Sequence, residues 1–359
     1  MERGNGISTL KVAGTYIGTV VGAGFASGQE VLQFFVNFGN AGFAGLLIVT
    51  FLFIVFGYII MELGRKLNAV SHLDIVRFSA GRYLGGFADI VITFFLFGSL
   101  TAMMAGSGAL FSQQFHVHPL IGSFLMAAIS MATVLSGFNN IVNSISFVVP
   151  FLIISAIGIS IASLLIAPET TAAYTIIPET GVLRNWLWSA ILYTSYNTVI
   201  SIAILGPLGA KAKDKKTIKR GAVLGGLGLG IGAAALFLAV RANIGLIGNL
   251  EVPMIFIAGR ISPVVQSAYG IILLAEIYTT AVGDLYGFTA RISSTRNVDM
   301  RNTVIISVLL AWGASLFGFS NMVKYLYPLV GYAGIMILAS LLYCRQKKPL
   351  DKTSLRGIR

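Results

Sequence analysis

Residues 14–30 read GTYIGTVVGAGFASGQE, the most informative stretch of the chain for its fold. It lies in an apolar run long enough to cross a bilayer, which takes about 20 residues, yet it holds five glycines and a glutamate. A glycine inside a helix costs about 0.5–1 kcal/mol relative to alanine. The glycines fit either close packing against neighbouring helices or a broken helix whose free backbone groups bind a solute or ion. Because they cluster at mid-span, near residues 21–25, and polar residues follow at Ser27, Gln29 and Glu30, we favour the break.

The rest of the chain is similarly apolar. Of its 359 residues, 56% are hydrophobic and 11% are charged, whereas a soluble domain carries about 25% charged residues. Ten runs reach the length of a membrane span, at about 10–37, 41–66, 84–113, 119–138, 141–166, 185–209, 217–241, 262–289, 302–318 and 322–343. The sequence therefore predicts an all-α polytopic membrane protein of about ten transmembrane helices.

Lysine and arginine lie almost entirely on one side of these spans. That side holds both chain ends and the loop from Lys211 to Arg220, whereas the other side holds only Arg184, Arg241 and Arg260. Loops rich in lysine and arginine stay in the cytoplasm, so we expect both termini there and the protein in the cell membrane. The net charge of +12 then reflects topology, and we expect no nucleic-acid partner. A single cysteine, Cys344, excludes an internal disulfide.

A second interruption is predicted five spans after the first. The run Tyr193 to Thr198 is polar and lies in the middle of the span 185–209, where such side chains compete with the hydrogen bonds of a helix. Interrupted spans at matching positions of two halves indicate a transporter built from inverted repeats. We therefore expect helices 1 and 6 to be broken. Residues 1–170 and 171–345 would form two inverted five-helix repeats, and 346–359 a cytoplasmic tail.

In these features the chain resembles the LeuT fold of the amino acid–polyamine–organocation superfamily. Residues 18–30 resemble the YkvI-type bacterial membrane proteins more closely still. The resemblance implies a sodium site, common in that fold, between the first and eighth spans. Its ligands here would be the carbonyls of Gly18 and Val21 and the hydroxyls of Thr279 and Thr280, because hard cations take oxygen ligands. The alternative is that both threonines bond to carbonyls of their own helix.

The resemblance also implies a solute pocket at the two breaks. The matching residues are Ala23, Gly24, Phe25 and Ser27 in the first span, and Tyr193, Thr194, Ser195 and Asn197 in the sixth. Amide groups at the start of the outer half of the first span suit a carboxylate, and Glu30, one turn further, suits an amine. We expect an amino acid or a related zwitterion. Another cation-bearing or polar solute stays open, because Gln29-Glu30 departs from the amino acid symporter pattern.

Five acidic residues fall inside the spans, where a charge costs at least about 2.5–3.5 kcal/mol. Three of them lie toward cytoplasmic ends and have basic neighbours in the sequence: Arg65 near Glu62, Arg82 near Asp89 and Arg291 near Asp284. We expect these three to form structural or gating ion pairs. Glu276 lies at mid-span on one helix face with Thr279 and Thr280, and it is the candidate for ion or proton coupling. The alternative is a neutral Glu276 that is hydrogen-bonded across helices.

The sequence thus predicts a secondary transporter that couples a small polar solute to sodium by alternating access. A proton-coupled transporter, or a sensor that binds solute without transport, stays an alternative. No enzyme is expected, because the chain has no H-E-x-x-H motif and no nucleophile–base set. His116 and His118 lack a third metal ligand, so they are expected to be a plain loop. The expected partners are the solute and the lipid bilayer, and sodium is the only expected bound cofactor.

Overall fold

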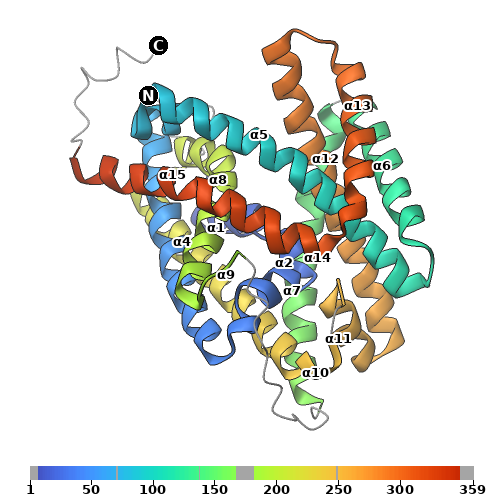
Figure 1. Cartoon of the computed structure of the whole chain (residues 1–359). Coiled ribbons are helices and arrows are strands. Elements are labelled where there is room, and N and C mark those ends of the chain that lie inside the picture. Colours follow the sequence, from blue (N-terminus) through green and yellow to red (C-terminus); the bar gives the residue numbers. More distant parts are fainter. Residues whose placement is uncertain (1–6, 70–71, 137, 167–181, 248–249, 348–359) are drawn as a thin grey trace.

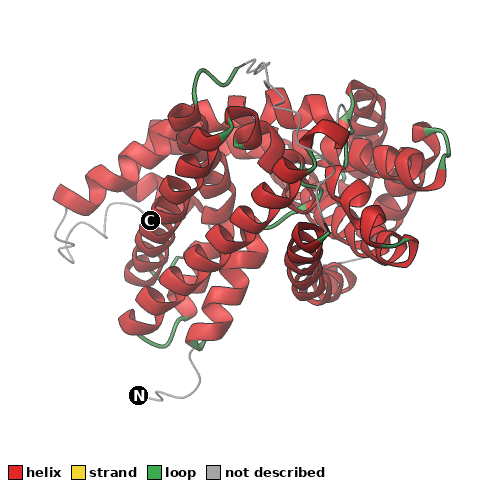
Figure 2. Cartoon of the chain, turned by 90° about the horizontal axis from the view of Figure 1, so that it is seen from below, coloured by secondary structure: helices red, strands yellow, loops and turns green. Residues whose placement is uncertain are grey.

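The computed structural model describes residues 7–69, 72–136, 138–166, 182–247 and 250–347, and within them it contains helices joined by short loops and no strand (Figure 1, Figure 2). Among these residues, eight helical runs are long and apolar enough to cross a bilayer. They are α4 (Asn40–Leu67), α5 (His72–Phe115), α6 (Pro119–Ser136), α8 (Trp186–Lys211), α9 (Lys215–Ala242), α12 (Pro263–Arg296), α13 (Met300–Ala314) with η2 (Ser315–Phe317), and the run from α14 (Phe319–Asn321) through η3 (Met322–Leu326) to α15 (Tyr327–Lys347).

Two further segments complete the ten predicted spans. One is α7 (Phe138–Leu165), and the other is the first span, which consists of short helices. The all-α polytopic fold class is therefore confirmed. Between α9 and α12 lie α10 (Ile244–Ile247) and α11 (Pro253–Ile261), which are too short to cross a bilayer. The predicted boundary at residues 170 and 171, and the tail from 348, lie outside the described residues.

The first span is broken where the glycines predicted it. Helix α1 (Thr9–Val20) ends at Val21, whose backbone is extended with ψ of 107°. A short helix, α2 (Ala23–Ala26), follows. Gly28 then has a φ of 81°, a left-handed conformation that favours glycine, and it precedes α3 (Gln29–Phe34). A short η1 (Val36–Phe38) leads into α4.

The second predicted break is wrong, because α8 runs as one helix through the polar stretch. Three polar side chains of this helix donate hydrogen bonds to carbonyls four residues back and so fit inside a continuous helix. The pairs are Thr194 to Ala190 at 2.9 Å, Asn197 to Tyr193 at 3.0 Å and Ser201 to Asn197 at 2.6 Å. These side chains therefore satisfy their donors without taking hydrogen bonds away from the backbone.

The helices pack in two groups (Figure 1). Helix α4 packs against α8 and α9, and α1 packs against α9. In the second group α5 packs against α12 and α6, and α13 packs against α6 and α12. Helix α15 crosses the front of the molecule in Figure 1 and contacts α8 of the first group and α5 of the second.

The ends of α4, α8 and α12 meet the starts of α5, α9 and α13 on one side of the molecule, here called the basic side. The N-terminal segment joins this side, because the Ile7 N–H donates to the Lys211 carbonyl at 3.1 Å. On this side α5 bends at Gly81, where φ is 82°, and its apolar part begins at Tyr83. The ends of α9 and α13 lie on the other side, here called the opposite side.

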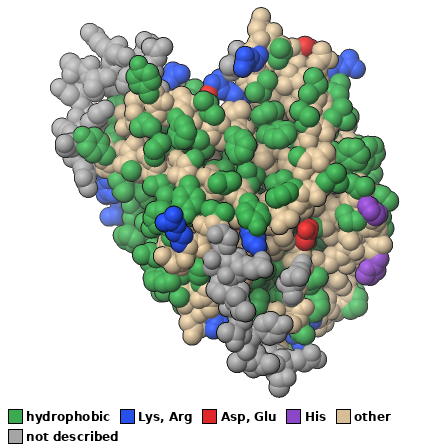
Figure 3. Space-filling view, in the orientation of Figure 1, with side chains coloured by type: hydrophobic (Ala, Val, Ile, Leu, Met, Phe, Trp, Pro, Cys, Tyr) green, Lys and Arg blue, Asp and Glu red, His purple; other side chains and the backbone are tan. Residues whose placement is uncertain are grey.

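The surface between the two sides is apolar (Figure 3). Large hydrophobic side chains such as Phe51, Ile90, Ile154 and Ile231 are each more than 60% exposed. Exposed apolar patches of this extent are rare on soluble monomers. A lipid environment accounts for them, because hydrocarbon is the solvent that these side chains favour.

Candidate functional site

A cavity of about 640 Å³ lies at the break in the first span. The backbone from Gly18 to Gly24 forms part of its wall, and side chains from α3, α5, α8, α12 and α15 form the rest. The cavity extends from Glu30 in α3 to Asp89 and Arg291 near the basic side. Because the last carbonyls of a helix have no partner inside that helix, the break supplies polar backbone groups to the cavity wall.

All four predicted sodium ligands line this one cavity. They are Gly18 and Val21 on the first span and Thr279 and Thr280 on α12. Gly18 belongs to the last turn of α1, where carbonyls lack helical partners. The Thr279 hydroxyl donates to the Glu276 carbonyl at 3.0 Å, as the alternative expected. A hydroxyl oxygen that donates one hydrogen bond keeps lone pairs for a cation, so the arrangement fits both interpretations.

Four of the predicted solute-binding residues also line the cavity. They are Ala23 and Gly24 at the start of α2, Glu30 in α3 and Asn197 in α8. Their side chains or backbone face a common space although they come from three separate helices. The structure therefore brings these four together with the predicted ion ligands.

The other five predicted solute-binding residues do not belong to the cavity wall, because their side chains have other partners. They are Phe25, Ser27, Tyr193, Thr194 and Ser195. Ser27 donates to the Gly24 carbonyl at 2.9 Å, and Ser195 donates to the Gly331 carbonyl at 2.7 Å. The ring of Tyr193 packs edge-on against Phe34 and Phe35, with centroid distances of 5.2 and 4.9 Å. Phe25 lies in the apolar core, and Thr194 bonds within α8.

Glu30 is held by a residue of the predicted polar run that is not among the individually predicted solute ligands. The hydroxyl of Tyr196 donates to Oε2 of Glu30 at 2.5 Å, and both residues line the cavity. The carboxylate also lies so close to Gly24 that a Cβ there would collide with it. Tyr196 belongs to the polar run Tyr193 to Thr198 in α8. Only the rotation of that helix decides that Tyr196, and not Tyr193, faces the cavity.

Glu276 and Asp284 lie on the cavity face of α12. Glu276 is 3% exposed, and Thr280 lies within hydrogen-bonding reach of its carboxyl group. Ser99 of α5 lies within the same reach of Asp284. One oxygen of each carboxyl group, Oε2 of Glu276 and Oδ2 of Asp284, is buried and finds no hydrogen-bond partner among the described residues. Both groups are therefore available to a proton or a cation.

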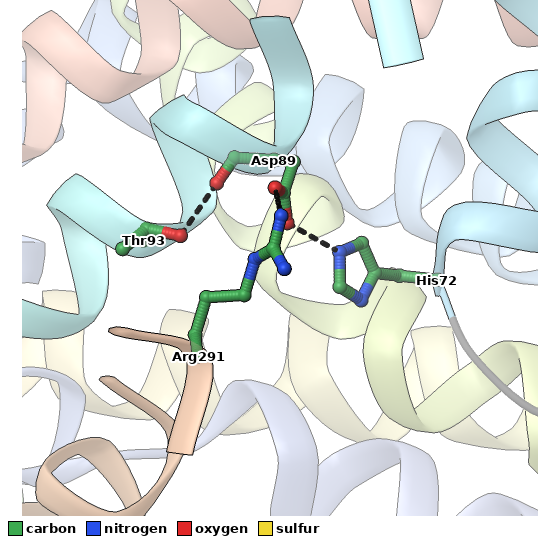
Figure 4. Close-up of polar contacts among 4 residues, drawn as sticks. All are labelled: His72, Asp89, Thr93 and Arg291. Atoms are coloured by element: carbon green, nitrogen blue, oxygen red, sulfur yellow. Dashed lines mark hydrogen bonds and ion pairs between the residues drawn. The ribbon is translucent and has the colours of Figure 1, made fainter. Parts of the chain in front are cut away.

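The basic end of the cavity carries a cluster of charged residues from two helices (Figure 4). Arg291 at the end of α12 pairs with Asp89 of α5, and His72 at the start of α5 places Nε2 3.6 Å from Oδ1 of Asp89. Thr93 donates to the Asp89 carbonyl at 2.7 Å. Burial lowers the pKa of His72, and the neighbouring Asp89 opposes that shift.

The partners in the structure differ from all three ion pairs predicted from sequence neighbours. Arg291, the predicted partner of Asp284, pairs with Asp89, for which the sequence predicts Arg82. Glu62 pairs with Lys66 at 3.4 Å and with Lys215 of α9 at 3.0 Å. Lys66 lies on α4 with Glu62. Helices that are distant in sequence supply Arg291 and Lys215, because packing brings α5 against α12 and α4 against α9.

The opposite side of the cavity is closed by contacts to α2 and α3. The Tyr269 hydroxyl of α12 donates to the Ala26 carbonyl at 2.5 Å. The backbone N–H of Met254 in α11 donates to the Ser27 carbonyl at 3.0 Å. Gln29 donates from Nε2 to the hydroxyl of Ser320 in α14 at 2.8 Å, so three separate segments hold the break closed on this side.

A second cavity, of about 610 Å³, lies on the opposite side. Its wall includes His118 and Glu251. Burial raises the pKa of Glu251, and hydrogen bonds from the N–H groups of Phe319 and Ser320 oppose that shift. In the part of the chain that the structure describes, no three His, Cys, Asp or Glu residues come together as a metal site.

Two proteins of Bacillus subtilis (strain 168) are similar to the chain over nearly its whole length. The membrane protein YkvI is 31% identical over 342 residues, which cover 95% of this chain and 97% of YkvI. YyaD is 27% identical over 326 residues, which cover 91% of this chain and 94% of YyaD. No family model matches the sequence.

Solved transporter structures share the fold. MhsT in complex with L-phenylalanine gives a TM-score of 0.65 at 17% identity, covering 96% of this chain and 93% of MhsT. The inward-facing conformation of Mhp1 gives a TM-score of 0.61 at 13% identity, covering 99% of this chain and 81% of Mhp1. A Na⁺-coupled sialic acid symporter gives a TM-score of 0.59 at 12% identity, covering 93% of this chain and 79% of the symporter. At these identities the likeness establishes the LeuT fold alone.

Proposed function

The chain belongs to the family of the Bacillus subtilis membrane protein YkvI, and we propose that it is an ion-coupled secondary transporter of a small polar solute that bears an amine. An amino acid or a related zwitterion is the expected solute class. The observation that carries the proposal is the cavity at the broken first span, because residues of the break, Glu30 and the threonines of α12 line one space. Broken helices supply solute and ion ligands in transporters of this architecture.

The proposed transport cycle is alternating access, and this conformation corresponds to its inward-facing state. The excess of lysine and arginine supports a cytoplasmic location for the basic side, and the cavity extends toward that side at Asp89 and Arg291. On the opposite side, Tyr269 and Gln29 close the break by hydrogen bonds. An outward-facing state would require these contacts to open while the basic side closes.

Sodium is the favoured coupling ion. Gly18 and Val21 of the first span and Thr279 and Thr280 of α12 line one cavity. Their carbonyls and hydroxyls would supply the neutral oxygen ligands that sodium, a hard cation, takes. Proton coupling is the second candidate, because the buried Glu276 has an oxygen without a partner among the described residues.

Thermal unfolding of the purified full chain in detergent tests the ion site. Sodium chloride should raise the Tm relative to potassium chloride at equal ionic strength, because a ligand that binds only the folded state stabilises it by about 2.7 kcal/mol at one hundred times its Kd. Thr279→Ala or Thr280→Ala should remove the difference. Thr289→Ala is the matched control, because Thr289 lies on the same helix, bonds to Leu285 at 2.6 Å and does not line the cavity.

Other outcomes of the same measurements would favour the alternatives. If sodium has no effect and Glu276→Gln removes a pH dependence of the Tm, protons are the coupling ion. If a solute binds the purified chain but reconstituted vesicles accumulate none of it under a sodium or proton gradient, the chain is a sensor. If sodium stabilises Thr279→Ala and Thr280→Ala as strongly as the wild type, the predicted ion site is wrong.

A further inference from the structure

Three aromatic rings from different helices form one wall of the main cavity. They are Phe95 of α5, Tyr196 of α8 and Tyr327 of α15, and all three line the cavity. The Tyr196 and Tyr327 centroids are 5.2 Å apart, and Phe95 lies 5.6 Å from Tyr327 and 6.3 Å from Tyr196. We call these residues the aromatic wall. Each is at most 5% exposed, so packing fixes the position of the rings.

Two carboxyl groups flank the aromatic wall. Glu30 accepts the hydrogen bond from Tyr196, and Asp284 lies within hydrogen-bonding reach of Ser99. Tyr327 lies close enough to both carboxyl groups to interact electrostatically with each. Oδ2 of Asp284 has no hydrogen-bond partner among the described residues. A group placed against the rings would therefore have carboxylate oxygens near it from two helices.

The charges around the cavity are separated into two sections. The basic residues of its wall, His72 and Arg291, both face Asp89 at the basic end. The inner section contains Glu30, Glu276 and Asp284, and no lysine or arginine among the described lining residues. Charged groups inside a membrane protein are almost always paired. If a coupling ion occupies the neighbourhood of Glu276, the two carboxyl groups beside the aromatic wall still lack a cation.

We propose that the aromatic wall, Glu30 and Asp284 form an ammonium-binding site, so that the preferred solutes are alkylamines with more positive than negative charge, such as diamines or basic amino acids. An ammonium group is attracted to aromatic faces and donates three hydrogen bonds, which the two carboxylates accept. A solute with a carboxylate and only one amine is bound less tightly, because its negative charge adds to the acidic inner section. This inference rests on the proposal that the cavity holds the transported solute.

Four probes of equal carbon number but different charge test the site. The full chain in detergent is titrated at equal ionic strength with 1,4-diaminobutane, butylamine, 4-aminobutyrate and butyrate, and the Tm is followed against concentration. The two amines should raise the Tm, with 1,4-diaminobutane acting at the lowest concentration. The zwitterion should bind at least about tenfold more weakly than the diamine, and butyrate should have no effect.

Variants connect the result to the named residues. Asp284→Asn should weaken diamine binding by about tenfold or more, because it removes a buried charge partner. Phe95→Leu keeps an apolar side chain and should weaken binding by about twofold to thirtyfold, the range expected from a cation–π contact. Glu62→Gln is the control and should not change binding, because Glu62 lies outside this cavity. If Asp284→Asn fails to fold, Phe95→Leu still tests the site.

Three results would overturn the inference. The first is equal or stronger stabilisation by 4-aminobutyrate or butyrate. The second is stabilisation by amines that Asp284→Asn and Phe95→Leu leave unchanged. The third is tight binding of a neutral or zwitterionic solute from a wider screen while all amines fail, which would leave the proposed transporter intact. If no solute of any charge binds and none is transported, the proposed function itself fails.

Discussion

The hydrogen bond between Tyr196 and Glu30 should hold the opposite side of the cavity closed. It connects α8 to α3 at 2.5 Å, and both side chains are at most 5% exposed. Replacing Tyr196 by phenylalanine removes the hydroxyl and keeps the ring, so packing against Phe95 and Tyr327 is preserved. We expect the variant to fold and to open its opposite side more often than the wild type.

The size of this effect follows from the burial of the bond. A hydrogen bond to a charged group contributes about 1.5–3 kcal/mol, and leaving a buried acceptor without its donor costs about 1–3 kcal/mol. Because every 1.4 kcal/mol changes an equilibrium about tenfold, the open population should rise by about tenfold to a hundredfold. The contacts from Tyr269, Met254 and Gln29 remain, so the closed state should still predominate.

Amide hydrogen exchange measures this opening directly. Peptides that cover α2 and α3 should exchange faster in Tyr196→Phe by the same factor, whereas peptides from α5 and α12 should not change. Tyr16→Phe is the matched control, because its hydroxyl donates to the Phe53 carbonyl at 2.7 Å away from the closure. If α2 and α3 exchange at the wild-type rate in Tyr196→Phe, or if Tyr16→Phe accelerates them equally, the bond does not hold the closure.

Three further predictions concern the Tm in detergent. Gly24→Ala should lower the Tm, because the new Cβ would collide with the carboxylate of Glu30 and overpacking costs about 1–3 kcal/mol. The control Gly14→Ala, at a position where space is open, should maintain or raise the Tm. Asp299→Ala should lower the Tm by removing about 0.5–2 kcal/mol of folding stability, because the Asp299 carboxylate accepts a hydrogen bond from an N–H in the first turn of α13 at 3.1 Å. Burial raises the pKa of Glu251, so the wild type loses stability as the pH rises from the ordinary glutamate pKa through the raised one. Glu251→Gln removes this loss, and its Tm should therefore increase relative to the wild type as the pH rises.

Each of these predictions has a contrary result. Equal Tm values for Gly24→Ala and Gly14→Ala would mean that Glu30 does not pack against the break. A Tm unchanged in Asp299→Ala would mean that the cap contributes nothing to the stability of α13. A Tm difference between Glu251→Gln and the wild type that is constant with pH, or that shrinks as the pH rises, would contradict the burial of that carboxyl group.

The membrane architecture and the first break could both be predicted from the composition and the local pattern of the chain. A transmembrane helix needs a run of about 20 mostly apolar residues. The spans can therefore be predicted from composition without knowing how the helices pack. The break could be read in the same way, because glycines near Val21 remove local support for a helix and Gly28 adopts a backbone conformation that favours glycine. These are local properties of a short stretch of chain.

The contacts between polar groups could not be predicted in this way, because they depend on how the helices pack. The polar run in α8 is the same in sequence whether the helix breaks or not, and it stays helical because Asn197 and its neighbours find carbonyls within the helix. Tyr196 reaches Glu30 and Arg291 reaches Asp89 because helices far apart in the chain pack side by side. Such pairings depend on the rotation and contact of whole helices, and no spacing along the sequence contains that information.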